Sequence, residues 1–549
     1  MGEALLDPAA LSSKIDAVNG STKPQTSSFP GLAVEIPAVA TLLVVGTALR
    51  LVAAFGTGAL VDELTYQYLG AYTWKHGFPD IRPELGQLPH PFLWHPPFFF
   101  FLLGGWFSLL GNDGLVTARL LSVLVSALML CLVYIVARKM LDARVALLAL
   151  FLIGLDPWLI LINQAVYIEN SQMVLILLAV WAYWSATRHG DHVDRREYIL
   201  RYCLAGLALG IAVMYKHIGG YLLLAVFVNL LLTRGRHKLG HAYLFAAAAS
   251  VLVIYFAAMH LAFGSLFDQE TLVQVRRTLG LSRAPGLNYG PLTAATAILR
   301  TYWIFPITIV TLVGGALTAL VCLVREMLGK RHGETIILSW AAATVIFGAG
   351  IALKSPHYFI LWLIPLYLLL SEQAPGAFSW LKRQIPTLQK YAAWEAGGIL
   401  ALVLVVNLWS FHERFLSGAS DSLESAIAYV NTYVPSNALV AVDGSAGPEL
   451  TRPYRTFPAQ TREELYRRDA VKPTRAEYLF LYWSLTNPIP APLGSLPTYC
   501  IQPHRFNGFN DHVEVCRIIV GRLSSQASRA GEAKPRQAKL TKPSGRKHA

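Results

Sequence analysis

Charged residues are scarce in this chain of 549 residues: they make up 14% of it, against 54% hydrophobic residues, and the mean hydropathy is +0.45. Soluble domains usually contain about 25% charged residues, so this composition excludes an ordinary soluble enzyme. The alternating segments of about ten residues that build an outer-membrane barrel are also lacking, because runs such as 145–162 and 242–263 have apolar residues on every face. The sequence predicts a polytopic α-helical membrane protein.

Cysteine is scarce as well, with five residues. Cys131, Cys203 and Cys322 lie in apolar runs and are expected to be small core residues. Cys500 and Cys516 lie in the polar C-terminal region. In an oxidising exterior they could form a disulfide; two unpaired buried thiols are equally compatible with the sequence.

A cleavable signal peptide is not recognisable, because residues 1–35 lack a short apolar core; they are expected to form a disordered cytoplasmic arm. The net charge of +13 does not indicate a nucleic-acid partner, since much of it sits in short clusters between apolar runs and in the basic tail. The positive-inside rule places these clusters in the cytoplasm. They are Arg138, Lys139 and Arg144; Arg188, Arg195, Arg196 and Arg201; Arg234, Arg236 and Lys238; Arg325, Lys330 and Arg331; and Lys382, Arg383 and Lys390.

The charge pattern predicts about 11 transmembrane helices, a cytoplasmic N-terminus and a C-terminal region outside a plasma or inner cell membrane. Pro96–Leu110 spans only fifteen residues, about 22 Å of helix, and is expected to lie at the outer interface within the first external loop, 59–114. A second long external loop covers 263–301. The predicted spans are 36–58, 115–137, 145–162, 171–187, 202–215, 218–232, 242–262, 302–323, 335–353, 358–371 and 394–411.

The composition after the last span is that of a soluble domain. Residues 36–411 are therefore expected to form the membrane domain, 412–520 a small extracytoplasmic α/β domain and 521–549 a basic disordered tail. Within 412–520 the periodicity predicts one helix, and buried runs predict strands. These elements are a helix over 422–433 and strands over 438–443, 477–482, 499–502 and 513–520.

Polar residues gather at the external ends of the predicted spans. The first external loop contains the acidic pair Asp62 and Glu63, followed later by His95. Adjacent acids can supply a general base or ligands for a divalent metal. The alternative is structural, with Asp62 capping the helix that starts near Leu64.

Shorter external turns contribute a second acid and several cations. Glu169 opens the fourth span, where it is either functional or favoured by the helix dipole. Lys216 and Lys354 either bind an anion or extend toward lipid phosphates. Because all these turns fall on one side, we expect one external cavity that combines a carboxylate base with groups for a phosphate. The groups for the phosphate also include His217 and His357, while Arg50 and Arg119 are supporting cations or structural partners of the acids.

These residues carry a family resemblance. The run Asp62-Glu63-Leu64-Thr65-Tyr66, then His95-Pro96-Pro97, then Gly111-Asn112-Asp113 leading to Arg119-Leu120, resembles the GT-C integral-membrane glycosyltransferases. The most similar group contains dolichyl-phosphate-mannose protein mannosyltransferases and lipid A aminoarabinose transferases. The resemblance continues through Glu169, Lys216-His217 and 354–365, and covers most of residues 36–370.

The resemblance implies a cell-envelope enzyme that transfers a hexose or pentose from polyprenyl phosphate to a glycan, lipid or protein acceptor. It implies that Asp62 is the base, with Glu63 beside it, and that Glu169 orients the acceptor or a metal. The donor phosphate would be bound by His95, Lys216, His217, Lys354, His357 and Tyr358. The chain departs from the group at Glu169, where Asp is common, and at His357, where Arg is common.

Two other functions remain open on the sequence. A transporter or flippase of lipid-linked glycans would need polar residues at the membrane midplane and often repeated halves, and neither is visible in the sequence. A scaffold that binds glycans through its exterior domain would leave Asp62, Lys216 and Lys354 dispersed. No metal or other cofactor is certain; a divalent metal held by Asp62, Glu63 and Glu169 is possible.

Overall fold

The computed structural model describes most of the membrane domain and the core of the C-terminal domain. The described residues are 32–58, 60, 62–80, 91–189, 194–234, 237–278, 305–329, 334–350, 356–384, 392–416, 422–442, 454–456, 477–484, 500–507 and 511–518. The predicted arm up to residue 31 and the predicted basic tail lie outside these ranges.

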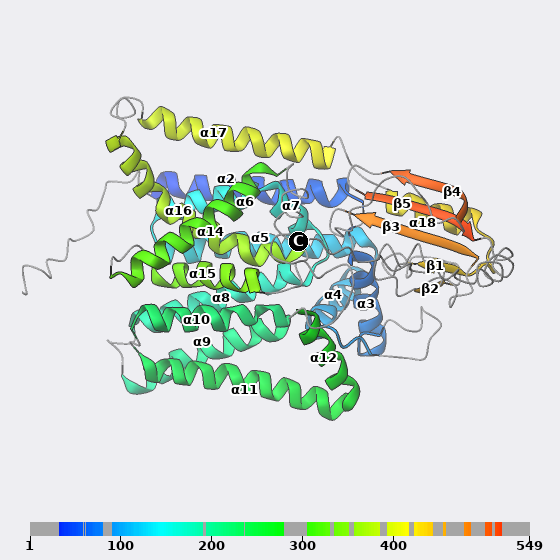
Figure 1. Cartoon of the computed structure of the whole chain (residues 1–549), viewed down its shortest axis with the longest axis horizontal. Helices are drawn as coiled ribbons and strands as arrows, with labels where there is room; N and C mark the ends of the chain where they lie inside the picture. The colour runs from blue at the N-terminus through cyan, green and yellow to red at the C-terminus, as the bar shows by residue number, and fades with distance from the viewer. Residues whose placement is uncertain are drawn as a thin grey trace, which may run out of the picture.

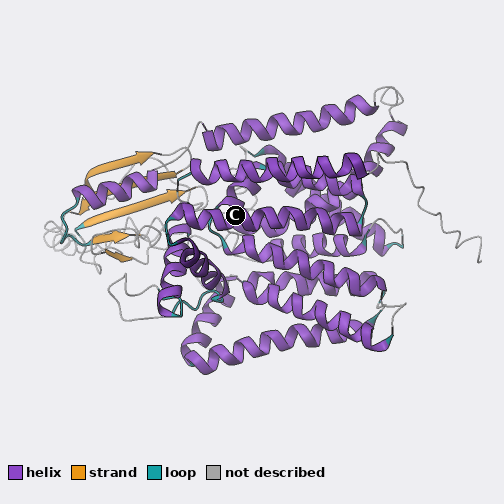
Figure 2. Cartoon of the chain, turned by 180° about the vertical axis from the view of Figure 1, so that it is seen from behind, coloured by secondary structure: helices purple, strands orange, loops and turns teal. Residues whose placement is uncertain are grey.

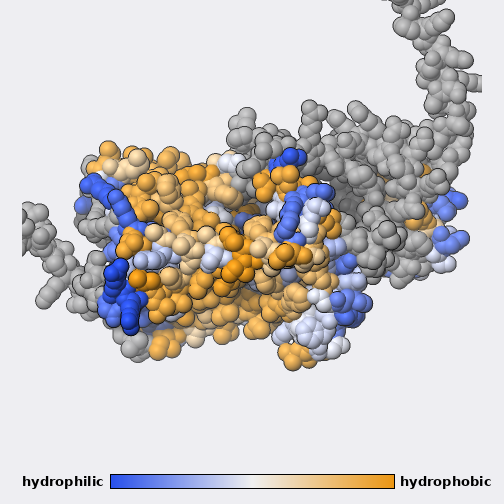
Figure 3. All heavy atoms as spheres, turned by 90° about the horizontal axis from the view of Figure 1, so that it is seen from below, coloured by the Kyte–Doolittle hydropathy of each residue, from blue (hydrophilic) through white to orange (hydrophobic). Residues whose placement is uncertain are grey.

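Long helices lie side by side in a bundle, and a five-stranded sheet lies at one end of it, which we call the sheet end (Figures 1 and 2). An apolar surface separates hydrophilic ends in the view of Figure 3. The bundle helices are α2 (Leu32–Gly56), α5 (Leu115–Met140), α6 (Ala143–Leu155), α7 (Pro157–Gln164), α8 (Ile168–His189), α9 (Arg195–Tyr215), α10 (Tyr221–Leu232), α11 (Lys238–Phe263), α14 (Pro306–Met327), α15 (Thr335–Gly350), α16 (Phe359–Gln384) and α17 (Ala392–Phe411).

Six helices of the described residues are long and apolar enough to cross a membrane, and the bent pair α6 and α7 makes a seventh candidate. The chain is therefore a multi-pass membrane protein. The count of 11 crossings remains a prediction, because several apolar helices are shorter than a full span. These are Phe98–Leu110, His217–Leu232, Thr335–Gly350 and Gly397–Phe411.

The helix boundaries differ from those predicted at two charged helix starts. Helix α2 begins at Leu32, within the segment expected to be a disordered arm, and Arg138 Nε binds Glu35 Oε1 at 2.8 Å. Helix α9 begins at Arg195 instead of residue 202, because Asp194 caps it by accepting from the Glu197 amide. Apolar runs alone do not predict the polar first turns of these two helices.

The predicted continuous span over 145–162 is wrong. It is broken at Asp156 into α6 and α7, whose axes differ by 66°. Pro157 has no amide hydrogen to donate, and Asp156 accepts from the Leu159 amide as the cap of α7. All eight residues of α7 are buried.

Close packing of α9 on α11 depends on glycine. A Cβ atom at Gly206 would lie 2.3 Å from the Leu244 carbonyl oxygen, and one at Gly210 would lie 2.8 Å from Val251 Cβ. The spacing of the two glycines places both on one face of α9, as in other membrane helix pairs with small residues at the interface.

Three shorter helices lie at the sheet end: α3 (Glu63–His76), α4 (Phe98–Leu110) and α12 (Ser265–Thr278) (Figure 1). Helix α4 packs against α3, where Leu103 contacts the position of Gly70 so closely that a Cβ there would lie 2.7 Å away. The segment 96–110 thus packs with the predicted first external loop.

The C-terminal domain contains α18 (Ser422–Tyr433), which coincides with the predicted helix, and a sheet with strand order β2-β1-β3-β5-β4. Strand β1 is parallel to β2 and β3, and the other pairs are antiparallel. Its apolar core includes Leu64 of α3 and contacts Leu115 of α5. Cys516 is disulfide-bonded, whereas the three cysteines of the bundle are free. The strands are β1 (Val440–Val442), β2 (Tyr454–Thr456), β3 (Tyr478–Ser484), β4 (Cys500–Asn507) and β5 (Asp511–Ile518).

Candidate active site at the sheet end of the bundle

Asp62 lies in the turn between α2 and α3 with an unusual backbone conformation. Its φ is 73°, in the left-handed region that few residues other than glycine adopt. It occupies the N-cap position of α3, but its side chain makes no capping hydrogen bond. The structural alternative for Asp62 is therefore wrong as far as side-chain capping is concerned. Strained backbone of this kind is often retained at functional sites.

Glu63 and Arg119 hold this turn in place. Arg119 of α5 binds Glu63 Oε2 at 2.7 Å and Oε1 at 3.0 Å, and both residues are almost fully buried. Arg119 also donates to the carbonyl oxygens of Ala54, Thr57 and Gly58. Glu63 accepts further hydrogen bonds from the amides of Leu60 (2.7 Å) and Val166 (2.9 Å). This geometry favours a positioning role for Glu63 over the predicted catalytic one.

The second predicted acid, Glu169, is the centre of a buried charged cluster. Its Oε1 atom lies 2.5 Å from Lys216 Nζ and 3.4 Å from His357 Nε2. Lys216 is only 3% exposed, so it does not extend toward lipid phosphates. Glu169 Oε2 is buried and has no hydrogen-bond partner among the described residues. The cluster therefore offers an acceptor oxygen beside a cation.

Aromatic rings enclose the cluster. Lys216 Nζ lies 5.0 Å from the centre of the Tyr358 ring, and His357 stacks on Tyr167 with ring centres 4.8 Å apart. Burial lowers the pKa of His357 to about 4, against the opposing effect of the Glu169 charge. His357 is thus a neutral hydrogen-bonding group at neutral pH.

Asp62 lies near the Glu169 cluster, because its neighbour Glu63 accepts from the Val166 amide, three residues before Glu169. Burial raises the pKa of Tyr66, and the charges of Asp62 and Glu169 both raise it further. Burial lowers the pKa of Lys216, but the charge of Glu169, with a smaller contribution from Asp62, raises it overall. The His95 ring lies 6.2 Å from the Tyr66 ring. Residues from α3, α8 and the turns before α10 and α16 therefore converge.

Comparisons with known proteins found chains with a similar fold. Residues 94–261 match the family described as dolichyl-phosphate-mannose-protein mannosyltransferase. The fold is similar to ArnT from Cupriavidus metallidurans bound to undecaprenyl phosphate, with a TM-score of 0.52, 16% identity and coverage of 88% of this chain and 98% of that one. It is also similar to the archaeal oligosaccharyltransferase AglB from Archaeoglobus fulgidus, in complex with an inhibitory peptide and a dolichol-phosphate. There the TM-score is 0.54 at 13% identity, with coverage of 81% and 69%.

The chain has the GT-C fold. A search of curated proteins found no match. The predicted resemblance to GT-C glycosyltransferases of the mannosyltransferase and ArnT type is confirmed.

Two predicted site residues of this chain make contacts outside the cluster, and a third lies outside the described residues. His217 stacks on Phe256 of α11, with ring centres 5.8 Å apart, and its predicted role as a ligand of the donor phosphate stays a prediction. His217 begins the short 3-10 helix η1 (His217–Gly220), and Lys216 immediately precedes it. Arg50 lies at the break between α6 and α7, bonded to Gly154 O at 2.8 Å. Lys354 lies outside the described residues.

The predicted metal ligands do not form a complete metal-binding site among the described residues. Among the described residues no group of three or more His, Cys, Asp or Glu side chains could hold a metal ion. The carboxylate of Glu63 is already bonded to Arg119 and two amides.

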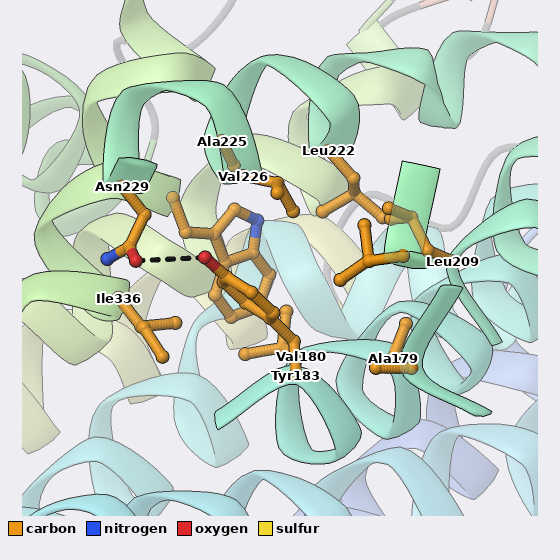
Figure 4. Close-up of a pocket in the computed structure, with 12 residues that line it drawn as sticks. Ala179, Val180, Tyr183, Leu209, Leu222, Ala225, Val226, Asn229 and Ile336 are labelled. Atoms are coloured by element: carbon orange, nitrogen blue, oxygen red, sulfur yellow. Dashed lines mark hydrogen bonds between the residues drawn. The ribbon is translucent and has the colours of Figure 1, made fainter. Parts of the chain in front are cut away.

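A well-defined cavity elsewhere in the bundle is distinct from this site. It is lined mainly by apolar side chains of α8, α9, α10 and α15, and Tyr183 donates to Asn229 Oδ1 at 2.9 Å on one side of it (Figure 4). The lining residue Val180 is eleven residues beyond Glu169 on α8, about 16 Å along the helix. The cavity therefore does not contribute to the charged cluster.

The sequence did not reveal Asp156, Asn163, Tyr167 and Asn170 as contributors to the site. Asn163 binds Arg50 and Asn170, and Asn170 donates to the Ile162 and Ala165 carbonyl oxygens, which shapes the turn before Glu169. One signal was present: an Asp-Pro pair inside an apolar run is typical of a broken helix.

Proposed function

We propose that the chain transfers a sugar from a polyprenyl-phosphate-linked donor to an acceptor hydroxyl, as an inverting glycosyltransferase. The observation that supports this proposal is the buried cluster of Glu169, Lys216 and His357, close to the Glu63 side chain that follows Asp62 in the chain. The ArnT and AglB structures that share the fold contain undecaprenyl phosphate and dolichol-phosphate, which supports a donor of this class.

Each group has a role in the proposed reaction. Asp62 takes the proton of the acceptor hydroxyl as its oxygen attacks the anomeric carbon, while the bond from that carbon to the phosphate oxygen breaks on the opposite face. Lys216 and His357 donate hydrogen bonds to the departing lipid phosphate, which receives the bonding electron pair. Glu169 Oε2 accepts from a hydroxyl of the sugar or the acceptor. Lys354 remains a predicted phosphate ligand.

We further propose that the site lies at the external membrane face. The positive-inside rule assigns Arg138, Arg188 and Arg201 to the cytoplasmic side, and these cations lie on the bundle helices α5, α8 and α9. In this topology the N-terminus is cytoplasmic, the chain crosses 11 times, and the α/β domain lies outside beside the site. A polyprenyl chain stays in the bilayer, so a site at headgroup level meets its phosphate.

The transporter alternative has weaker support. It requires a polar path through the midplane. Arg50, the buried cation of α2, is instead fully engaged by Asn163 and the carbonyl oxygens of Gly46, Ile153 and Gly154.

The test is incubation of the purified protein with a panel of polyprenyl-phosphate sugars and candidate acceptors, measuring released lipid phosphate. We expect release by the wild type and a loss of at least 1,000-fold, about 4 kcal/mol in the barrier, in Asp62→Asn. Asp113→Asn is the matched control, because Asp113 is an exposed acid of the same region paired only loosely with Lys75, at 3.5 Å. Normal transfer by Asp62→Asn would refute the assignment. A parallel arm with chelator tests the metal.

A further inference from the structure

The break between α6 and α7 has both of its helix ends satisfied by buried side chains of opposite charge. At the start of α7, Asp156 Oδ1 accepts from the Leu159 amide at 2.8 Å. At the end of α6, Arg50 of α2 donates to the carbonyl oxygens of Gly154 (2.8 Å) and Ile153 (3.3 Å). An anion thus faces a helix N-terminus and a cation faces a C-terminus, which is the favourable arrangement for the helix dipoles.

The other oxygen of Asp156 connects the break to two distant helices. Asp156 Oδ2 accepts from Thr308 Oγ1 of α14 at 2.8 Å and from the Tyr367 hydroxyl of α16. Helix α16 continues directly from the short helix η2 (Pro356–Tyr358), which contains His357 and Tyr358. Asp156 therefore connects the start of α7 to α16, the helix that follows the proposed phosphate-binding residues His357 and Tyr358.

The C-terminal end of α7 leads to the turn before Glu169, on the side of the site that contains the carboxylates. Asn163 Nδ2 donates to Asn170 Oδ1 at 3.0 Å, and Arg50 binds Asn163 Oδ1 at 3.0 Å. Val166 follows and donates to Glu63, and then Tyr167 stacks on His357. Because α7 is buried along its whole length, a shift at its start would be transmitted to the turn before Glu169.

We propose that Asp156 is a positioning residue for the transfer reaction: through Tyr367 and Thr308 it fixes the bent helix α7, and so sets the spacing between the Glu169 turn and the His357 turn. This inference rests on the proposed function for its kinetic consequence. Asp156 touches no reacting atom in this scheme. It acts by holding the carboxylate side and the phosphate side of one site at a fixed separation, which the chemistry needs to within a fraction of an ångström.

The first variant is Asp156→Asn. The amide can still cap α7 through Oδ1, but it presents an N–H₂ group to two hydroxyls and leaves Arg50 without a nearby anion. We expect kcat per folded protein to fall about 10- to 100-fold, since a 1 Å displacement of reacting groups has an effect of this order. Tyr367→Phe removes one hydroxyl and keeps the ring, so we expect a smaller loss of the same kind in a protein that folds.

Tyr183→Phe is the matched control, because it also removes a buried tyrosine hydroxyl, one bonded to Asn229 and His241 away from the site. It should change thermal stability without changing kcat or the KM for the lipid donor. Hydrogen–deuterium exchange supplies a readout that does not depend on activity. Amides over 157–170 should exchange faster in Asp156→Asn and Tyr367→Phe, and at the wild-type rate in Tyr183→Phe.

The outcomes separate this inference from the proposed function. Wild-type protein that transfers no sugar would refute the function, while faster exchange confined to 157–170 would still support the coupling of Asp156 to α7. Wild-type kcat and KM per folded molecule in both Asp156→Asn and Tyr367→Phe would overturn the positioning role. So would unchanged exchange over 157–170.

Discussion

Removal of the Arg119 guanidinium provides a direct test of how the Asp62 turn is held. Arg119 makes two bonds to Glu63 and three to carbonyl oxygens of the segment that ends α2. Arg119→Met leaves the Glu63 carboxylate buried with only two amide donors. Breaking a buried ion pair from one side costs about 3–5 kcal/mol. Arg119→Lys keeps the charge but has three donors in place of five, so we expect a loss of about 2 kcal/mol.

The assay is thermal unfolding in detergent combined with the lipid-phosphate release assay. Arg119→Met should unfold at a clearly lower temperature, and transfer by the remaining folded protein should fall at least tenfold because Asp62 leaves its left-handed conformation. Arg138→Met is the control, since Arg138, in the last turn of α5, pairs with Glu35, in the first turn of α2, at a partly exposed site. If Arg119→Met were as stable and as active as Arg138→Met, the idea that the bonds of Arg119 hold the Asp62 turn in place would be wrong.

Three further predictions concern Lys216, His357 and Gly206. Lys216→Met should destabilise the fold by about 3 kcal/mol or more and abolish transfer, because it leaves Glu169 buried beside a neutral histidine, whereas exposed Lys75→Met should do neither. The pKa of His357 falls from 6.5 to about 4 on folding, so folding stability that is present above pH 6.5 should be lost as the pH falls toward 4, by up to about 3 kcal/mol. Melting curves measured from pH 7.5 to 4.5 should depend less on pH in His357→Gln than in the wild type. Gly206→Val should separate α9 from α11 and reduce the yield of folded protein, whereas Gly314→Ala, which meets no atom within 4 Å, should not.

The sequence was sufficient to locate the polar turns but not to assign roles within the acidic pair. Asp62 and Glu63 are adjacent and chemically alike, so the pattern assigned both to catalysis. Their surroundings differ because Arg119, 56 residues away, binds both carboxylate oxygens of Glu63. A contact at that sequence separation has no local signal.

Lys216 and His217 show a similar limit. Both belong to a short polar turn, yet one pairs with Glu169 and the other stacks on Phe256. The direction of each side chain depends on the 3-10 turn that begins at His217, and composition does not specify that geometry. Asp156, in contrast, was visible before Pro157 in the sequence, but averaging hydropathy over 145–162 concealed it.

The packing of Leu64 and Leu115 into the core of the C-terminal domain has an evolutionary consequence. An apolar residue two positions after Asp62 is part of the hydrophobic core of another domain, so the two regions cannot diverge independently. In a chimera that carries a relative's C-terminal domain, residues 64 and 115 would have to be exchanged with it, and substitutions there should covary with those at Ala426 and Val430 across homologues.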